Sequence, residues 1–319
     1  MLKMLIKSVR IGYPSRAGFQ LFRVILTYAW LAGLNITNWR KTSLPRLENV
    51  SKVWSQFSQW LIFSVAYIDP RDWARTPLIK DVTLVQTNPI SLENAASIDA
   101  KTYVEIQNIA IKFSSAFNGL EAENYFNWLC RYQLMLDSFQ ECGLKLTSGE
   151  LDVAEIGPGL APVTSLLSNS TRGIHSYDTY EMQIVAKYVE QSVISPKTKI
   201  TYHPMNLENG KNAEAPASSR YCVVAFYSLT ELSISERAKY FDLIENAEFT
   251  LIASNQYFGG VDNFDYIEKL ADKLKLSSTN KQVGDVFETE IPGYVKKHRI
   301  YLLFGENIKN QLKTINLGA

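Results

Sequence analysis

The stretch DVAEIGPGLAPVTSLL, residues 152–167, joins a short apolar run, two glycines separated by a proline, and a segment of helical character. In an open α/β sheet, the turn after the first strand lies against the ligand. Gly157 and Gly159 allow backbone N–H groups to approach that ligand, and the helix from about Pro162 points its positive end at an anionic group. Taken alone, the motif is equally compatible with a structural tight turn.

The chain around this turn has the pattern of an α/β protein. From residue 143 onward, short apolar runs alternate with helical stretches, which predicts a parallel sheet with right-handed crossovers. Strands are predicted at 152–156, 173–177, 199–205, 221–226, 249–254 and 299–304, and helices at 51–68, 99–117 and 123–142. We expect a mainly helical N-terminal region, 1–145, and a cofactor-binding α/β domain, 146–319. The aromatic stripe of the 123–142 helix is assigned to packing.

Charge is distributed unevenly along the chain. The whole sequence carries a formal charge of +1, which gives no general indication of nucleic-acid binding. Residues 1–47 nevertheless contain eight basic and no acidic side chains. This basic arm predicts either peripheral contact with an anionic membrane surface or docking onto the chain's own acidic body. The expected location is therefore cytoplasmic, at the inner face of the membrane if the arm binds lipid.

Within the arm, residues 19–36 are apolar nearly all round a helix but include Arg23. The run falls short of about 20 uninterrupted apolar residues, so a spanning helix is disfavoured. A buried cap helix, interfacial attachment and a targeting segment remain open. The three cysteines and three histidines have no zinc-ligand spacing, so we expect no metal and a reducing compartment.

Two acidic residues flank the glycine turn. Glu155 lies on the preceding strand, and Asp178 ends the next one, where a carboxylate can accept hydrogen bonds from ribose hydroxyls. This arrangement also permits NAD or FAD. A dinucleotide site, however, needs a third glycine under the pyrophosphate, and Ala161 and Pro162 stand near that position. S-adenosylmethionine has no pyrophosphate, so the sequence favours it.

The segment AEIGPGLAP resembles motif I of class I methyltransferases. The segments HSYDTYEMQIVAKYVEQ and VVAFYSLTELSISERAKYFDLIENAEFTLIASNQ resemble the second, fourth and fifth strands of a sugar O-methyltransferase family found in bacterial polysaccharide gene sets. The resemblance covers roughly residues 145–305 and implies a Rossmann-like class I methyltransferase sheet behind a helical N-terminal cap. This chain departs from the family at Phe226, where Asn is usual, and at Leu232, where Met is usual.

The resemblance implies a set of site residues. Glu155, Gly157 and Gly159 would face the methionine part of the cofactor, Asp178 the ribose and Asn206 the adenine. The residues expected at the cofactor are Glu155, Gly157, Gly159, Asp178, Asn206, Phe226 and Tyr227, and the residue expected at the substrate is Asn255.

Methyl transfer to a sugar hydroxyl requires alignment and a base that takes the hydroxyl proton. Glu231 is the leading candidate for that base, with Ser228 and Tyr227 as positioning groups, and His298 is the alternative. SLTE, residues 228–231, is also a capping box, so both roles stay open. The remaining histidines, His175 and His203, are interpreted as structural, and the acidic side chains Asp285, Glu288 and Glu290 as solvated.

Two other functions compete with a sugar O-methyltransferase. A nicotinamide-dependent sugar oxidoreductase or epimerase needs a Tyr-x-x-x-Lys pair, whereas Tyr180 and Lys187 are seven positions apart. A non-catalytic adaptor that retains the fold would explain the basic arm. The expected partner is a sugar or glycan substrate and not nucleic acid, and the acceptor sugar and oligomeric state are left open.

Overall fold

The computed structural model describes residues 71, 90, 92–117, 121–140, 144, 146, 149–194, 196–205, 212–218, 220–258, 260–282, 298–305 and 308. Outside these residues lie the basic arm 1–47 with its apolar stretch 19–36, the predicted helix 51–68, Asn206, and the acidic group 285–290.

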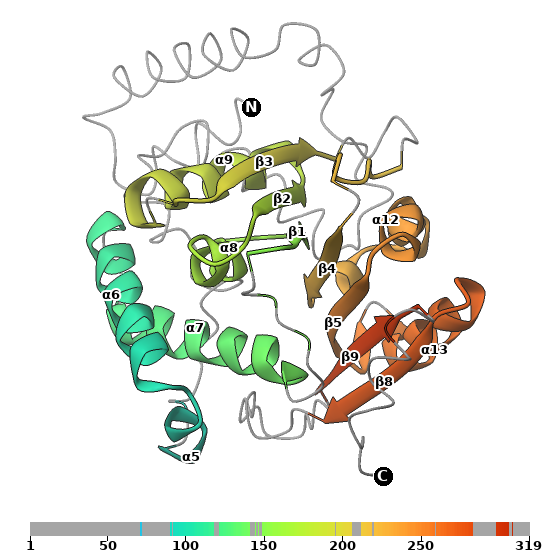
Figure 1. Ribbon diagram of the computed structural model, residues 1–319, viewed down its shortest axis with the longest axis horizontal. Helices are drawn as coiled ribbons and strands as arrows, with labels where there is room; N and C mark the ends of the chain where they lie inside the picture. Colours follow the sequence, from blue (N-terminus) through green and yellow to red (C-terminus); the bar gives the residue numbers. More distant parts are fainter. Residues whose placement is uncertain are drawn as a thin grey trace, which may run out of the picture.

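The centre of the protein is a seven-stranded sheet of order β3-β2-β1-β4-β5-β9-β8 (Figure 1). Its strands are β1 (Asp152–Ile156), β2 (Gly173–Asp178), β3 (Lys199–Pro204), β4 (Tyr221–Phe226), β5 (Phe249–Asn255), β8 (Ser277–Gln282) and β9 (His298–Phe304). The six predicted strands are confirmed to within one residue at each end. Strands β1 to β5 are parallel, and β9 runs antiparallel between β5 and β8. This order, with its single reversed strand, confirms the Rossmann-like class I methyltransferase fold.

Two features of the right-hand part of the sheet differ from expectation. The strand predicted at 299–304 as part of a parallel sheet is β9, which runs antiparallel to both of its neighbours, β5 and β8. Strand β8 precedes β9 in the chain and lies next to it at the edge of the sheet, so the two form an antiparallel ladder. The edge strand β8, SSTNKQ, was not predicted because it contains no apolar residue. Its residues alternate between half-buried and exposed, and Lys281 donates from Nζ to the carbonyl of Ser138 at 2.6 Å. Tertiary pairing with β9 thus forms this strand.

Helices precede and connect the strands. They are α5 (Leu92–Ala96), α6 (Ala100–Ala116), α7 (Ala122–Asp137), α8 (Pro162–Leu167), α9 (Tyr180–Val189), α10 (Ser228–Glu231), α11 (Ile234–Arg237), α12 (Phe241–Glu245) and α13 (Asn263–Lys273). Short π and 3-10 turns continue α9 (Glu190–Ile194) and α11 (Ala238–Tyr240), and β6 (Tyr257–Phe258) pairs with β7 (Val261–Asp262). The predicted helices at 99–117 and 123–142 are confirmed as α6 and α7, although α7 ends earlier, at Asp137.

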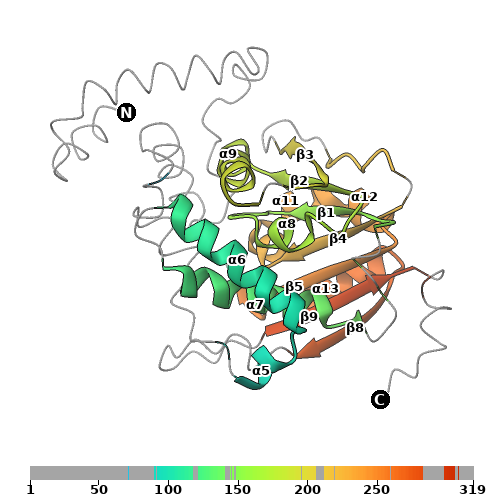
Figure 2. The same cartoon turned by 60° about the vertical axis from the view of Figure 1, so that its left-hand side comes forward.

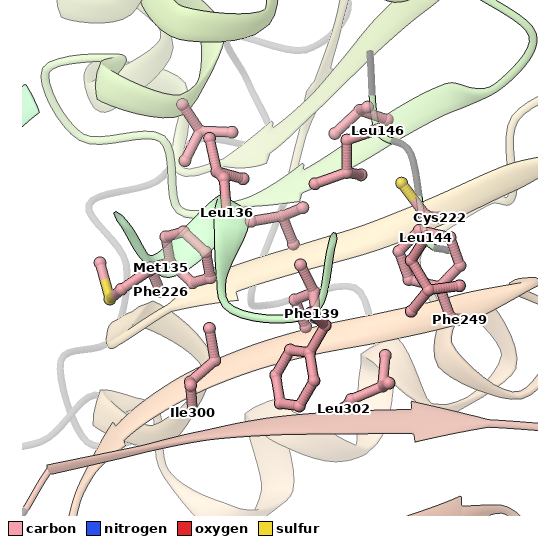
Figure 3. Packing of buried hydrophobic residues seen from close by; sticks show 14 of the residues in the cluster. Met135, Leu136, Phe139, Leu144, Leu146, Cys222, Phe226, Phe249, Ile300 and Leu302 are labelled. Atoms are coloured by element: carbon pink, nitrogen blue, oxygen red, sulfur yellow. The ribbon is translucent and has the colours of Figure 1, made fainter. Parts of the chain in front are cut away.

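Alternation along the strands produces two apolar faces. On one face, α7 and α8 pack over alternate residues such as Val153 and Phe226, and α6 lies beside α7 in a further layer (Figures 1 and 2). Figure 3 shows Met135 and Phe139 among the strand residues of this face. On the other face, Ala154 and its equivalents contact residues of α12 and α13. Helix α7 and the sheet therefore share one core.

Within the described part of the chain, no helix combines the length and apolar character needed to cross a membrane.

Candidate functional site

The turn after β1 has an unusual backbone. Gly157, Gly159 and Ala161 all have positive φ, at 68°, 54° and 56°. The left-handed region costs a residue with a Cβ about 1–2 kcal/mol, so surrounding contacts must hold Ala161 in place. Two such contacts are the hydrogen bond from Tyr125 of α7 to the carbonyl of Leu160, at 3.0 Å, and that from the Ala161 N–H to the carbonyl of Pro158, at 2.7 Å. Helix α7 thus supports the turn from outside the sheet.

Gly157 is required by a close approach between β1 and β4. A Cβ added there would lie 2.3 Å from Cβ of Ser228, whereas a Cβ at Gly159 would meet nothing within 4 Å. The Ser228 hydroxyl donates a hydrogen bond to the carbonyl of Ile156. Ser228 therefore directs its donor hydrogen at the end of β1, while Gly159 leaves space next to the turn for a ligand.

The two predicted carboxyl groups lie at the carboxyl edge of β1 and β2. Glu155 is 3% exposed and accepts a hydrogen bond from Thr164 Oγ1 at 2.5 Å. Burial raises the pKa of Glu155 to about 7, and the nearby charge of Asp178 acts in the same direction. Asp178 is half-buried and accepts from the N–H of Thr179 at 2.6 Å. The fold thus brings the predicted carboxyl pair to one edge beside the glycine turn.

The end of β4 is also strained. Tyr227 has φ 65° although it is not glycine, and its N–H donates to the carbonyl of Ala253 at 2.8 Å. It is the N-cap of α10 and makes no side-chain capping bond, so Ser228 is the first helical residue and does not cap as a capping box requires. Strained non-glycine residues cluster at functional sites. The strain here turns the chain sharply just before Glu231.

Three further predicted residues meet on the face that α7 covers. Asn255 and His298 are direct cross-strand partners of β5 and β9. The Tyr227 ring lies edge-on to the His298 ring, with centroids 5.7 Å apart. Oδ1 of Asn255 is buried and accepts no hydrogen bond from the described residues. Glu231 is half-buried, and its charge contributes to the raised pKa of Tyr227, behind the larger effects of burial and Tyr132.

Helix α7 contributes side chains near the site that the sequence did not predict. Tyr132, assigned to packing from the sequence, lies edge-on to Phe226 with centroids 5.5 Å apart. Arg131 is 3% exposed; burial lowers its pKa, and the charges of Cys130 and Tyr227 oppose that shift. An arginine among the aromatic residues of a buried helix was the one signal in the sequence that this helix reaches a polar site.

The other candidate polar groups lie elsewhere. His175 and His203 form a ring-to-ring hydrogen bond of 2.9 Å between β2 and β3, with Asp152 at 3.7 Å from His175. Among the described residues, no group of three or more His, Cys, Asp or Glu side chains could hold a metal ion.

Solved structures resemble this chain at low sequence identity. A scan against protein-family models and a search of curated proteins find no match. A SAM-dependent methyltransferase from Aquifex aeolicus has a TM-score of 0.40 at 12% identity, over 54% of this chain and 89% of that chain. Magnesium protoporphyrin IX methyltransferase from Synechocystis, with bound SAM, has 0.43 at 14%, over 66% and 99%. The cyclase SpnF has 0.44 at 9%, over 69% and 99%. Because one fold hosts several activities, function follows from the residues of the site.

Proposed function

We propose that this protein is an S-adenosylmethionine-dependent methyltransferase. The observation that carries the proposal is the joint placement of Glu155, the glycine turn and Asp178 at the carboxyl edge of β1 and β2. Ligands of open α/β sheets bind at this edge, near the point where strand order reverses, here between β1 and β4.

The residues present fit that cofactor. An adenosyl ligand offers ribose hydroxyls to Asp178 and brings no pyrophosphate, so the absence of a third glycine is tolerated. The open position beside Gly159 leaves room at the turn for the methionine part. Glu155 lies directly behind the turn and supplies a buried carboxyl group. When bound, the cofactor supplies an activated methyl group.

The proposed acceptor is a sugar hydroxyl in a bacterial polysaccharide or glycan. This part rests on the sequence resemblance over residues 145–305, and the polar groups at the β4–β5 edge support it. Oδ1 of Asn255 is a buried hydrogen-bond acceptor, suited to a hydroxyl donor. His298 lies opposite it on β9, and the Tyr227 ring lies against His298.

Transfer forms a bond between the methyl carbon and the hydroxyl oxygen, breaks the carbon–sulfur bond, and releases the hydroxyl proton. Glu231 or His298 accepts that proton. The other side chains align the oxygen with the methyl group, which is the larger part of catalysis in such a displacement.

The basic arm supports a further part of the proposal. Residues 1–47 carry positive charge only, so we propose that they contact an anionic membrane surface on the cytoplasmic side. Sedimentation of the full chain with phosphatidylglycerol vesicles at low but not high salt is the expected result. No sedimentation at low salt contradicts this contact.

The cofactor is tested by calorimetric titration with S-adenosylhomocysteine and, separately, with NAD. Binding of the first and not the second is expected. Binding of NAD alone refutes the proposal, and binding of neither ligand favours a non-catalytic adaptor. The acceptor is tested by comparing the glycan composition of source cells with and without the protein, where loss of one O-methyl group is expected.

A further inference from the structure

We propose that Tyr132 of α7 lies against the sulfonium centre of the bound methyl donor and makes the site prefer the charged donor over its neutral, demethylated product. This inference rests on the proposed function and adds a residue that the strand-end motifs do not include.

Helix α7 connects the two halves of the site. Tyr125 bonds to the carbonyl of Leu160 in the glycine turn, and Tyr132 contacts Phe226 at the end of β4. The two tyrosines are seven residues, or about 10 Å, apart along the helix. Tyr132 therefore lies on the path from the turn to the acceptor edge.

Packing fixes the orientation of the Tyr132 ring. The side chain is 8% exposed and lies edge-on to both Trp128 and Phe226, with centroids 5.1 and 5.5 Å away. Aromatic packing against these two rings thus holds the Tyr132 ring in place.

The charges of two carboxyl groups act on this ring. Burial raises the pKa of Tyr132, and the charges of Glu155 and Glu231 raise it further. The phenol consequently stays neutral and does not act as a base. Asp178 adds negative charge beside Glu155, whereas the buried Arg131 lies near Tyr227 at the acceptor end. The cofactor end of this region therefore attracts a cation.

The sulfonium is that cation. With the methionine part at the glycine turn and the acceptor at Glu231 and Asn255, the sulfur lies between them, beside Tyr132. An aromatic face within about 6 Å of a cation binds it with about 0.5–2 kcal/mol, or roughly 2- to 30-fold in affinity. Transfer of the methyl group leaves a neutral thioether, so the product lacks this attraction. Release of the product, S-adenosylhomocysteine, is therefore favoured.

The test is the ratio of affinities for S-adenosylmethionine and S-adenosylhomocysteine, measured by calorimetry. In Tyr132→Leu, affinity for the first is expected to fall about 2- to 30-fold while affinity for the second changes little. Tyr132→Phe keeps the ring and is expected to retain most of the ratio. Phe139→Leu is the matched control: it removes a buried aromatic ring from the same apolar cluster and should lower thermal stability without altering the ratio.

Equal weakening of both ligands in Tyr132→Leu, or no weakening, overturns the inference while leaving the proposed function intact. If the wild-type chain binds neither ligand, the proposed function fails as well. A second measurement serves if Tyr132→Leu does not fold. When the methyl group of the donor is labelled with carbon-13, a nuclear Overhauser contact between this methyl group and the Tyr132 ring is expected in the wild type. Tyr132→Phe assigns the signal, because the cross-peak at the frequency of the tyrosine ring protons must disappear in this variant. Its absence in the wild type overturns the placement.

Discussion

The β1–β2 edge and the β4–β5 edge of the same sheet are constructed in different ways. At the first, a contiguous stretch from Glu155 to Ala161 sets the geometry through its own backbone angles. At the second, Tyr227, Asn255 and His298 come from three strand ends and meet through cross-strand pairing and ring contact. We infer that the first edge depends mainly on backbone conformation and the second mainly on side-chain chemistry, so substitutions should affect them differently.

The largest expected effect is that of Gly157→Ala. Its Cβ would lie 2.3 Å from Cβ of Ser228, and φ of 68° is unfavourable for alanine. Left-handed strain and overpacking together predict a loss of about 2–5 kcal/mol in the free energy of unfolding, with loss of cofactor binding. Urea denaturation and calorimetry measure both.

Gly159→Ala separates steric overlap from backbone strain. No atom lies within 4 Å of the added Cβ, so only the strain of about 1–2 kcal/mol is expected. A loss of stability equal to that of Gly157→Ala would contradict the steric role of Ser228.

The next effect concerns Glu155 and pH. Its pKa is about 7 in the folded protein and 4.5 in the reference state, so the folded state binds more protons between these values. The stability from this group is therefore complete below about pH 4.5 and is lost as pH rises through about 7. Above pH 7, Glu155→Gln should exceed the wild type in unfolding free energy by about 3 kcal/mol. Denaturation at pH 5 and pH 8 measures this, and parallel pH profiles of the two proteins would exclude it.

At the β4–β5 edge the expected effect is on turnover. If Glu231 accepts the hydroxyl proton, Glu231→Gln should lower kcat by about 10²-fold or more while cofactor affinity is kept. If His298 is the base, His298→Ala should instead lose activity together with the acidic limb of the rate–pH profile. Full activity in both variants would remove both candidates and leave alignment by Tyr227 and Asn255 without a dedicated base.

The same contrast decides what the sequence could predict. The glycine turn, Glu155 and Asp178 were readable because strand, turn and strand follow one another and a parallel sheet places their ends at one edge. The fold class was readable from the alternation of apolar runs for the same reason.

The rest depended on contacts that no local pattern encodes. Strand β8 is polar and exists because β9 pairs with it. Tyr132 looks like a packing residue in the sequence and reaches the site only because α7 crosses from the glycine turn to Phe226. The hydroxyl of Ser228 was expected near the acceptor, and its donor bond to Ile156 became visible only with β1 and β4 side by side.

The smallest expected effect is that of Asp178→Ala. The side chain is half-buried at a strand end, and the N–H from which it accepts, at 2.6 Å, belongs to the adjacent residue Thr179. Its removal should therefore leave the fold intact. Loss of charged hydrogen bonds to the ribose should weaken S-adenosylmethionine binding by about 1–3 kcal/mol, or roughly 5- to 150-fold. Asp265→Ala, which removes an exposed carboxylate paired with Lys269 on α13, is the control and should not change affinity.

Calorimetric titration of the two variants with S-adenosylmethionine decides whether Asp178 binds the ribose. If affinity is unchanged in Asp178→Ala, the ribose does not lie at the end of β2, and backbone geometry at the glycine turn would then have to hold the cofactor without that carboxylate.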